Sequence, residues 1–317
     1  MEEKFRRIIL IDIARGLAII GVVIYHFAFD LKLLNFIQTD VTENIFWVAF
    51  ARILASSFLF LVGVSLVFAH GNKIRWKPFL KRVLIIGIAA LGISVATFFA
   101  FPDMFIYFGI LHAIALFSIL ALPFLKAPLW LIGFAAFLVI FSAYTFSFEV
   151  FNQKIFSWIG FWQIPPYTSD LVPIFPAFGA TLLGVFFARF AIKKKLVNRL
   201  ADFSPKGLWT NFLIKSGKWS LIIYLIHQPI LLGILYPIAF VVKPNELTKE
   251  QAFYGACFSN CLEVSGGATN CKNYCNCSLE QVEENRLWEI INLPILTKEQ
   301  NQEIISVSKL CSALAKE

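Results

Sequence analysis

Seven apolar runs, each long enough to cross a lipid bilayer, constrain this chain more than any other feature of its sequence. At about 1.5 Å per residue, a helix of roughly 20 apolar residues crosses a hydrocarbon core of about 30 Å. The runs cover residues 8–28, 45–69, 83–101, 106–124, 128–148, 171–191 and 217–242. Only 15% of the residues are charged, against about 25% in soluble domains. We therefore expect an all-α, polytopic transmembrane bundle of about seven helices over residues 1–242, embedded in a lipid bilayer.

The basic residues gather in alternate connections between these runs. Lysines and arginines follow the second run at residues 73–82 and the sixth at 193–206, while the other connections carry mostly Asp and Glu. In a soluble protein a net charge of +8 would point to nucleic acid, but this placement is the positive-inside pattern. We expect no nucleic-acid partner. The pattern predicts a bacterial-type inner membrane, a cytoplasmic N-terminus and, after an odd number of spans, an extracytoplasmic tail.

The first run does not have the features of a cleaved signal peptide. It contains Asp12 and Arg15 and lacks a small-x-small cleavage site. We therefore expect it to be retained as the first membrane helix.

All six cysteines lie in the tail, residues 243–317, at Cys257, Cys261, Cys271, Cys275, Cys277 and Cys311. This segregation is typical of an oxidising compartment and predicts a small disulfide-stapled domain, with fifteen possible pairings. A zinc site is the alternative, since thiolates in C-x3-C spacing also bind zinc. Because the charge pattern independently places the tail outside, we favour disulfides and predict no metal. Helical spacing appears over 279–292 and 297–315, with loop around Gly266 and Gly267.

Two charges lie in the first apolar run, where an ionisable group costs several kcal/mol unless it is paired or faces a polar cavity. Asp12 and Arg15 are three residues apart and share a helix face. They form either a structural ion pair at the mouth of the helix, or an anion site in which Asp12 orients Arg15 toward a phosphate. Lys215 and Lys218, beside Gly217 and Ser216, offer a further phosphate contact or ordinary positive-inside charge.

Three histidines lie within the apolar runs. His26 lies eleven residues beyond Arg15, so the two are about 16 Å apart on one side of a helix. His112 is expected near the outer end of the fourth helix, and His227 with Gln228 lies in the seventh, next to Pro229. Either His26 or His112 is suited to act as a base; the alternative is a histidine that is merely hydrogen-bonded inside the bundle. Asp30, His227 and Gln228 are further cavity candidates, with His227 also explicable as filling a proline kink.

Four motifs in order along the chain carry a family resemblance. They are Ile11-Asp12-Ile13-Ala14-Arg15-Gly16 continuing to His26, then Phe58 to Ser65, Gly109-Ile110-Leu111-His112, and Gly217-Lys218-Trp219-Ser220 continuing to Pro229. Together they resemble the catalytic domain of the heparan-alpha-glucosaminide N-acetyltransferase family over residues 6–240. Arg15 and His26 also match the Arg-x10-His pattern of acyltransferase family 3. The tail has no counterpart in this resemblance.

The resemblance implies transfer of an acetyl group from cytoplasmic acetyl-CoA to a sugar or other glycan- or lipid-linked acceptor across the membrane. Asp12, Arg15, Lys215 and Lys218 would then bind CoA, and His26 or His112 would be catalytic. A transporter or flippase of an anionic or lipid-linked sugar is the leading alternative, because buried Arg and His also line substrate pathways. A scaffold with the tail as binding module is the third.

Overall fold

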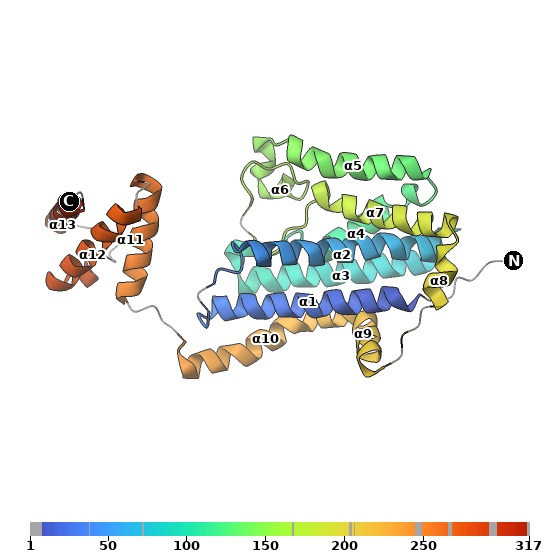
Figure 1. Cartoon of the computed structure of the whole chain (residues 1–317), viewed down its shortest axis with the longest axis horizontal. Helices are drawn as coiled ribbons and strands as arrows, with labels where there is room; N and C mark the ends of the chain where they lie inside the picture. Colours follow the sequence, from blue (N-terminus) through green and yellow to red (C-terminus); the bar gives the residue numbers. More distant parts are fainter. Residues whose placement is uncertain are drawn as a thin grey trace. The chain divides into compact units, whose positions relative to one another are not determined.

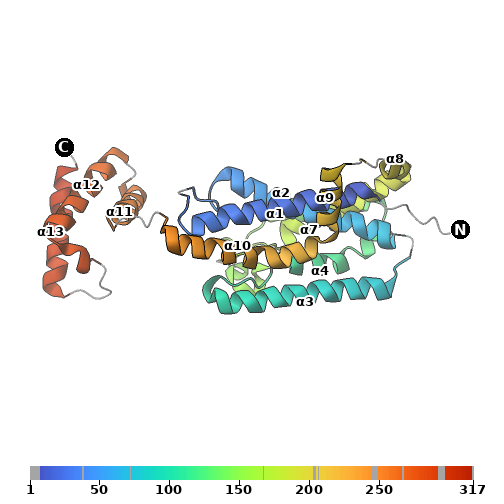
Figure 2. The same ribbon diagram turned by 90° about the horizontal axis from the view of Figure 1, so that it is seen from below.

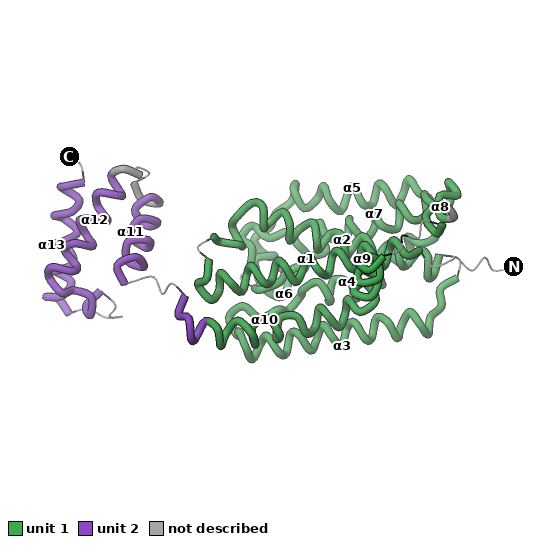
Figure 3. The backbone as a smooth tube through the Cα atoms, turned by 60° about the horizontal axis from the view of Figure 1, so that its bottom comes forward, with its two compact units in different colours: residues 1–238 green, residues 239–317 purple. Residues whose placement is uncertain are grey.

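The computed structural model describes residues 8–37, 39–71, 73–166, 168–202, 205, 207–244, 249–265, 268–291 and 297–315. These residues are largely helical and contain no β-strand, which confirms the all-α prediction. The chain divides into two compact units, Met1–Ile238 and Ala239–Glu317, coloured separately in Figure 3. The boundary between the units lies inside the last apolar helix, whereas the sequence placed the domain boundary after residue 242. The predicted loop at Gly266 and Gly267 lies outside the described residues.

Among the residues that the structure describes, five helices are long and apolar enough to cross a membrane: α1 (Ile9–Leu33), α2 (Ile45–His70), α3 (Trp76–Ala100), α7 (Ile174–Lys193) and α10 (Ser220–Val242). The fourth and fifth apolar runs form shorter helices, α4 (Ile110–Leu120) and α5 (Leu129–Thr145). The fourth run breaks because Pro123 has no N–H to continue the ladder and begins a 3-10 turn instead. The chain is a multi-pass membrane protein in which all seven predicted runs are helical.

Short elements connect these helices. They are the 3-10 turns Pro102–Met104, Pro123–Leu125 and Glu149–Asn152, and the helices α6 (Lys154–Ser157), α8 (Leu196–Asp202) and α9 (Leu208–Lys218). Figures 1 and 2 both show α8 and α9 at the end of unit 1 where α1 begins. The long helices run along one common direction, so residues near the start of α1 and near its end lie at opposite ends of the bundle.

Glycines let the helix backbones of unit 1 approach closely at two crossings. A Cβ on Gly63 of α2 would lie 2.1 Å from the Thr181 carbonyl oxygen of α7, and one on Gly184 would lie 2.0 Å from that of Phe60. At the α1–α9 crossing, a Cβ on Gly217 would lie 1.9 Å from the carbonyl oxygen of Asp12. Such contact through small residues is how membrane helices associate when lipid removes the hydrophobic drive.

The core of unit 1 is formed where α2, α4, α5 and α7 meet, around the fully buried Leu66, Phe117, Ile132 and Leu182. Large apolar side chains also cover the outside of α3, α5 and α10, including Leu91, Phe99, Trp130, Phe137 and Phe240. A soluble protein would rarely expose so much continuous apolar surface, and here it is the face expected to contact lipid.

Unit 2 is a small helical domain of α11 (Lys249–Ser265), α12 (Ala268–Glu284) and α13 (Lys298–Leu314). The helix expected over 279–292 is displaced: α12 begins earlier and ends at Glu284, and the segment around the cysteines is helical rather than loop. The expected helix over 297–315 matches α13, whose start is capped by Thr297 accepting from the Gln300 N–H. The cysteine spacing itself accounts for the difference, because C-x3-C places two thiols on one helix face.

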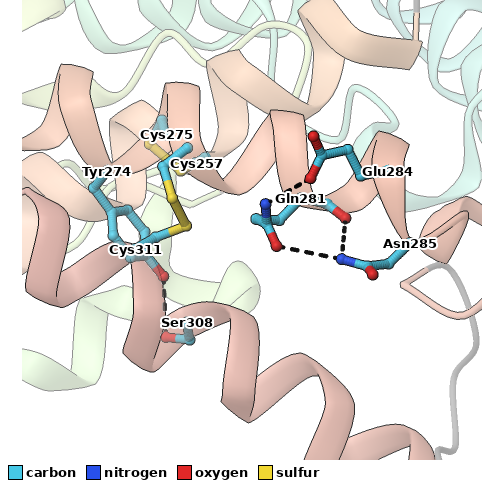
Figure 4. The surroundings of a disulfide bond; sticks show 9 residues. Cys257, Tyr274, Cys275, Gln281, Glu284, Asn285, Ser308 and Cys311 are labelled. Atoms are coloured by element: carbon cyan, nitrogen blue, oxygen red, sulfur yellow. Dashed lines mark hydrogen bonds between the residues drawn. A yellow bond between two sulfur atoms is a disulfide. The ribbon is translucent and has the colours of Figure 1, made fainter.

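Three disulfides hold this unit together, pairing Cys257 with Cys275, Cys261 with Cys271, and Cys277 with Cys311. The first two are nested, as expected when two antiparallel helices with matching four-residue spacing are joined face to face. The third joins α12 to α13, beside the hydrogen bond between the Tyr274 and Ser308 hydroxyls (Figure 4). Disulfides add stability to a domain with too few residues for a large core.

Candidate active site

The candidate residues on α1 lie in two groups, at opposite ends of one helix. We call Asp12, Arg15, Ser65 and Arg82 the basic cluster, and His26, Asp30, His227 and Gln228 the histidine cluster. Arg15 and His26 are separated by about three helical turns, roughly 16 Å along the axis. One helix therefore carries both groups and fixes the distance between them.

The histidine cluster forms where α1 packs against α10. The imidazole rings of His26 and His227 meet edge to face with their centroids 4.8 Å apart. Tyr25 and Tyr224 flank the pair, with ring centroids 5.6 Å from His26 and 5.6 Å from His227 respectively. The structure thus brings together two histidines that lie 201 positions apart in the sequence (227 − 26).

Asp30 and Gln228 form the second half of this cluster. The Gln228 Nε2 donates a hydrogen bond of 2.6 Å to Asp30 Oδ1, and Asp30 has no exposed surface. One oxygen of each group is left without a hydrogen-bond partner, namely Asp30 Oδ2 and Gln228 Oε1. Since both oxygens only accept, this part of the cluster is suited to bind a group that donates hydrogen bonds.

Unpartnered buried polar atoms concentrate in this cluster. His26 Nδ1 and His227 Nε2 join the two oxygens above, so each member of the cluster contributes one such atom. Buried polar groups in proteins are usually hydrogen-bonded, because leaving one without a partner costs about 1–3 kcal/mol. Four such atoms in one place, drawn from two helices, make this cluster a candidate binding site.

His227 also has the structural role that the sequence allowed for it. Pro229 lies inside α10 and cannot donate to the helix ladder. One turn earlier, the Nδ1 of His227 lies 2.7 Å from the Tyr224 carbonyl oxygen. His227 is therefore anchored to the backbone of its own helix through one nitrogen, while its other nitrogen belongs to the unpartnered set.

The basic cluster lies at the end of the bundle where α1 begins. Arg15 donates a hydrogen bond to the Ser65 hydroxyl of α2, and its guanidinium lies 4.0 Å from the buried carboxylate of Asp12. The Arg15 side chain remains 28% exposed. Arg82 of α3 lies within electrostatic reach of Arg15, which places two guanidinium groups close together. Such a pair favours a multiply charged anion such as a phosphate.

Lys215 and Lys218 are exposed in the last turn of α9. Their helix is held against α1 by the contact of Gly217 with the Asp12 backbone, so both lysines are carried to the same end of the bundle as Arg15.

Arg82 and Ser65 were missed as site residues by sequence reasoning. The basic pair Lys81-Arg82 at the start of an apolar run was the available signal for the first.

His112 lies on α4 and bonds to groups outside the histidine cluster. Its Nδ1 accepts from the Gly109 N–H at 3.2 Å, and its Nε2 lies 3.2 Å from the Ser94 hydroxyl of α3. Both ring nitrogens are thus engaged. The imidazole borders a cavity of about 470 Å³ between α3 and α4, whose other walls include Tyr107, Phe108 and Trp158.

Asp170 connects these regions and was not singled out from the sequence. Its Oδ2 accepts from the Ile110 N–H at 2.9 Å, at the start of α4, while its charge is within electrostatic reach of Tyr25 and Tyr224. Burial raises the pKa of this carboxyl to about 6. The only sequence signal was an acid immediately before the apolar run that becomes α7.

No group of three or more His, Cys, Asp and Glu side chains in the described part of the chain is placed to hold a metal ion.

Comparison with known families bears on the same residues. The profile of the heparan-alpha-glucosaminide N-acetyltransferase catalytic domain matches residues 7–229, which include every member of the two clusters. The chain belongs to this family. Membership confirms the resemblance drawn from the four motifs and points to a membrane-bound acetyltransferase. The matched region ends before unit 2 begins. No curated protein and no solved structure gives a significant match.

Proposed function

We propose that this protein is an integral-membrane acetyltransferase that uses acetyl-CoA from the cytoplasm. The acceptor is a sugar or another glycan- or lipid-linked group on the extracytoplasmic side. The single observation that carries the proposal is the set of four unpartnered buried polar atoms in the histidine cluster. The histidine cluster lies about 16 Å along α1 from the basic cluster with its partly exposed Arg15. The chain also belongs to an acetyltransferase family.

The basic cluster is proposed to hold the phosphates of CoA. Arg15 is oriented by Ser65 and Asp12, Arg82 adds a second guanidinium, and Lys215 with Lys218 contributes exposed positive charge at the same end. Guanidinium groups bind phosphate oxygens through two parallel hydrogen bonds, which both hold and orient the anion. The thioester at the far end of the extended CoA arm would then be directed along α1 toward His26.

The histidine cluster is proposed to carry out the transfer. A neutral imidazole removes a proton from the acceptor hydroxyl or amine, which then attacks the thioester carbonyl carbon. The sequence proposed His26 or His112 for this role. The geometry supports the histidine cluster, which contains His26, over His112, because His26 has a buried nitrogen without a partner whereas both nitrogens of His112 are engaged. Asp30 and Gln228 are proposed to bind the donor groups of the acceptor.

Orientation follows from the same arrangement. The lysine- and arginine-rich end is proposed to face the cytoplasm, by the positive-inside rule, in a bacterial-type inner membrane. Unit 2 then lies outside the cytoplasm, in the compartment where its three disulfides are stable.

Purified protein in liposomes, with acetyl-CoA supplied on one face, tests this proposal. We expect acetyl-CoA to bind, to be hydrolysed slowly without acceptor, and to acetylate glucosamine enclosed on the opposite face. Movement of a sugar without thioester consumption would instead establish a transporter. If the protein neither bound acetyl-CoA nor transported a sugar, only the scaffold hypothesis would remain.

A further inference from the structure

His227 is held in one tautomer by hydrogen bonding to the backbone of its own helix. Its Nδ1 lies 2.7 Å from the Tyr224 carbonyl oxygen. A carbonyl oxygen only accepts hydrogen bonds, so Nδ1 must carry the proton. In the neutral ring, Nε2 then presents a bare lone pair, which is the form a general base requires.

That lone pair is located where a substrate group would be bound. His227 Nε2 is buried and has no hydrogen-bond partner, and the His26 ring packs edge to face beside it. The next residue of α10, Gln228, together with Asp30 supplies two unpartnered acceptor oxygens. A base and two hydrogen-bond acceptors in one cluster suit a substrate that gives one proton to the base while its other hydrogen-bond donors bind to the two oxygens.

His112 shows the opposite tautomer and makes a useful contrast. Because the Gly109 N–H donates to Nδ1, the proton of a neutral His112 lies on Nε2, which can donate to the Ser94 hydroxyl. Ser94 in turn donates to the Ile106 carbonyl at 2.6 Å. This series of hydrogen bonds engages both ring nitrogens, so His112 joins the start of α4 to α3 and has no free lone pair for a substrate.

We infer that His227 Nε2 is the proton acceptor in the proposed transfer, with the Tyr224 carbonyl setting its tautomer; this rests on the proposed function. The acceptor nitrogen or oxygen gives its proton to Nε2 and forms a bond to the acetyl carbonyl carbon. The carbon–sulfur bond breaks, and the proton passes from the imidazolium to the leaving thiolate. The products are the acetylated acceptor and free CoA thiol, with His227 neutral again.

Two variants separate the anchoring nitrogen from the reacting one. The amide nitrogen of His227→Asn lies near the position of Nδ1 and keeps the donor to Tyr224, but nothing replaces Nε2. The amide of His227→Gln reaches the position of Nε2 without being a base, and the bond to Tyr224 is lost. We expect both variants to bind acetyl-CoA as wild type does and to lose at least about 100-fold in kcat for acetyl transfer.

The two variants should differ in stability. His227→Asn should keep the wild-type melting temperature, whereas His227→Gln should melt lower. An Asn variant that folds and retains more than a third of wild-type kcat would overturn the inference. So would a parallel loss of acetyl-CoA binding in both variants.

Nitrogen NMR of histidine-labelled wild-type protein provides a measurement that needs no activity. The His227 signals, identified by their disappearance in the Gln variant, should show a protonated Nδ1 and an unprotonated Nε2. The reverse assignment would overturn the inference even if the Asn variant does not fold. If wild type shows the expected tautomer but transfers no acetyl group, the proposed function fails, and the role of His227 as its base fails with it.

Discussion

The polar side chains at the two ends of α1 differ in whether the protein itself supplies their hydrogen-bond partners. In the basic cluster the protein itself supplies partners, since Arg15 donates to Ser65 and lies close to Asp12, and the Arg15 side chain stays partly exposed. In the histidine cluster each of four residues keeps one buried atom without a partner. The first arrangement orients a charge toward a large soluble anion. The second leaves unused hydrogen-bonding capacity, which a bound group can satisfy.

The comparison also shows what each end costs the protein. The free-energy cost of the partly exposed Arg15 is small, because Asp12 and Ser65 replace part of the hydration that its charge loses. A buried carboxylate such as Asp30 with one unpartnered oxygen is expensive. We expect substitutions in the histidine cluster to affect turnover, and substitutions in the basic cluster to affect CoA binding.

The largest effect should come from His26→Ala. Because the His26 ring packs against the proposed base His227 and carries one of the four unpartnered atoms, we expect acetyl transfer to fall by at least about 100-fold, while acetyl-CoA binds as before. Transfer kinetics and calorimetric binding measure the two quantities separately. His112→Ala is the control: because both of its nitrogens tie α3 to α4, it should lower the melting temperature more than turnover. If folded His26→Ala protein transferred acetyl groups at the wild-type rate, the proposed division of turnover and CoA binding between the two ends of α1 would be wrong.

Arg15→Ala should act on binding. A hydrogen bond to a charged group contributes about 1.5–3 kcal/mol, so acetyl-CoA affinity should fall by about 10- to 100-fold, with a smaller loss for Arg82→Ala. Calorimetry on protein in nanodiscs measures this. Lys81→Ala, which removes an exposed cation at the same end, should change affinity little. If Lys81→Ala weakened binding as much as Arg15→Ala, general charge rather than the cluster would be responsible.

Gly217→Ala should disturb the basic end alone. The new Cβ would lie 1.9 Å from the Asp12 carbonyl oxygen, so α9 must move away from α1. Overpacking of this kind costs roughly 1–3 kcal/mol, and we expect a lower melting temperature together with weaker acetyl-CoA binding. Gly233→Ala on α10 is matched, since no atom lies within 4 Å of its added Cβ. Equal melting temperatures for the two variants would show that the crossing is not close-packed.

The smallest effect should be a pH dependence of stability from Asp170. Burial raises its pKa from 3.8 to about 6, so the folded state binds the proton more tightly than the unfolded state. Its contribution to stability is therefore greatest below about pH 4, declines as pH rises toward 6, and is constant above. Asp170→Asn keeps an acceptor for the Ile110 N–H and should flatten the melting temperature over this range. An unchanged profile would exclude Asp170 as its source.

Much of the membrane unit was predictable from local sequence. The apolar runs predicted the helices because length and hydropathy alone decide what can cross a bilayer. Arg15, His26 and Asp12 were found because a charged or polar residue stands out in such a run. The same reasoning overestimated the fourth run, where Pro123 ends the helical ladder, and it misplaced a helix in unit 2, where cysteine spacing outweighed a polar composition.

Sequence by itself determined which helices exist and where their ionisable residues lie along each axis, because hydropathy and the 1.5 Å rise are local properties. Only the tertiary structure decided that His26 meets His227 rather than His112, that Gln228 bonds Asp30, and that Arg82 approaches Arg15. It also selected one cysteine pairing of fifteen. The physical reason is that facing contacts depend on helix rotation and crossing, which close approaches at Gly16, Gly63, Gly184 and Gly217 set between segments distant in the chain.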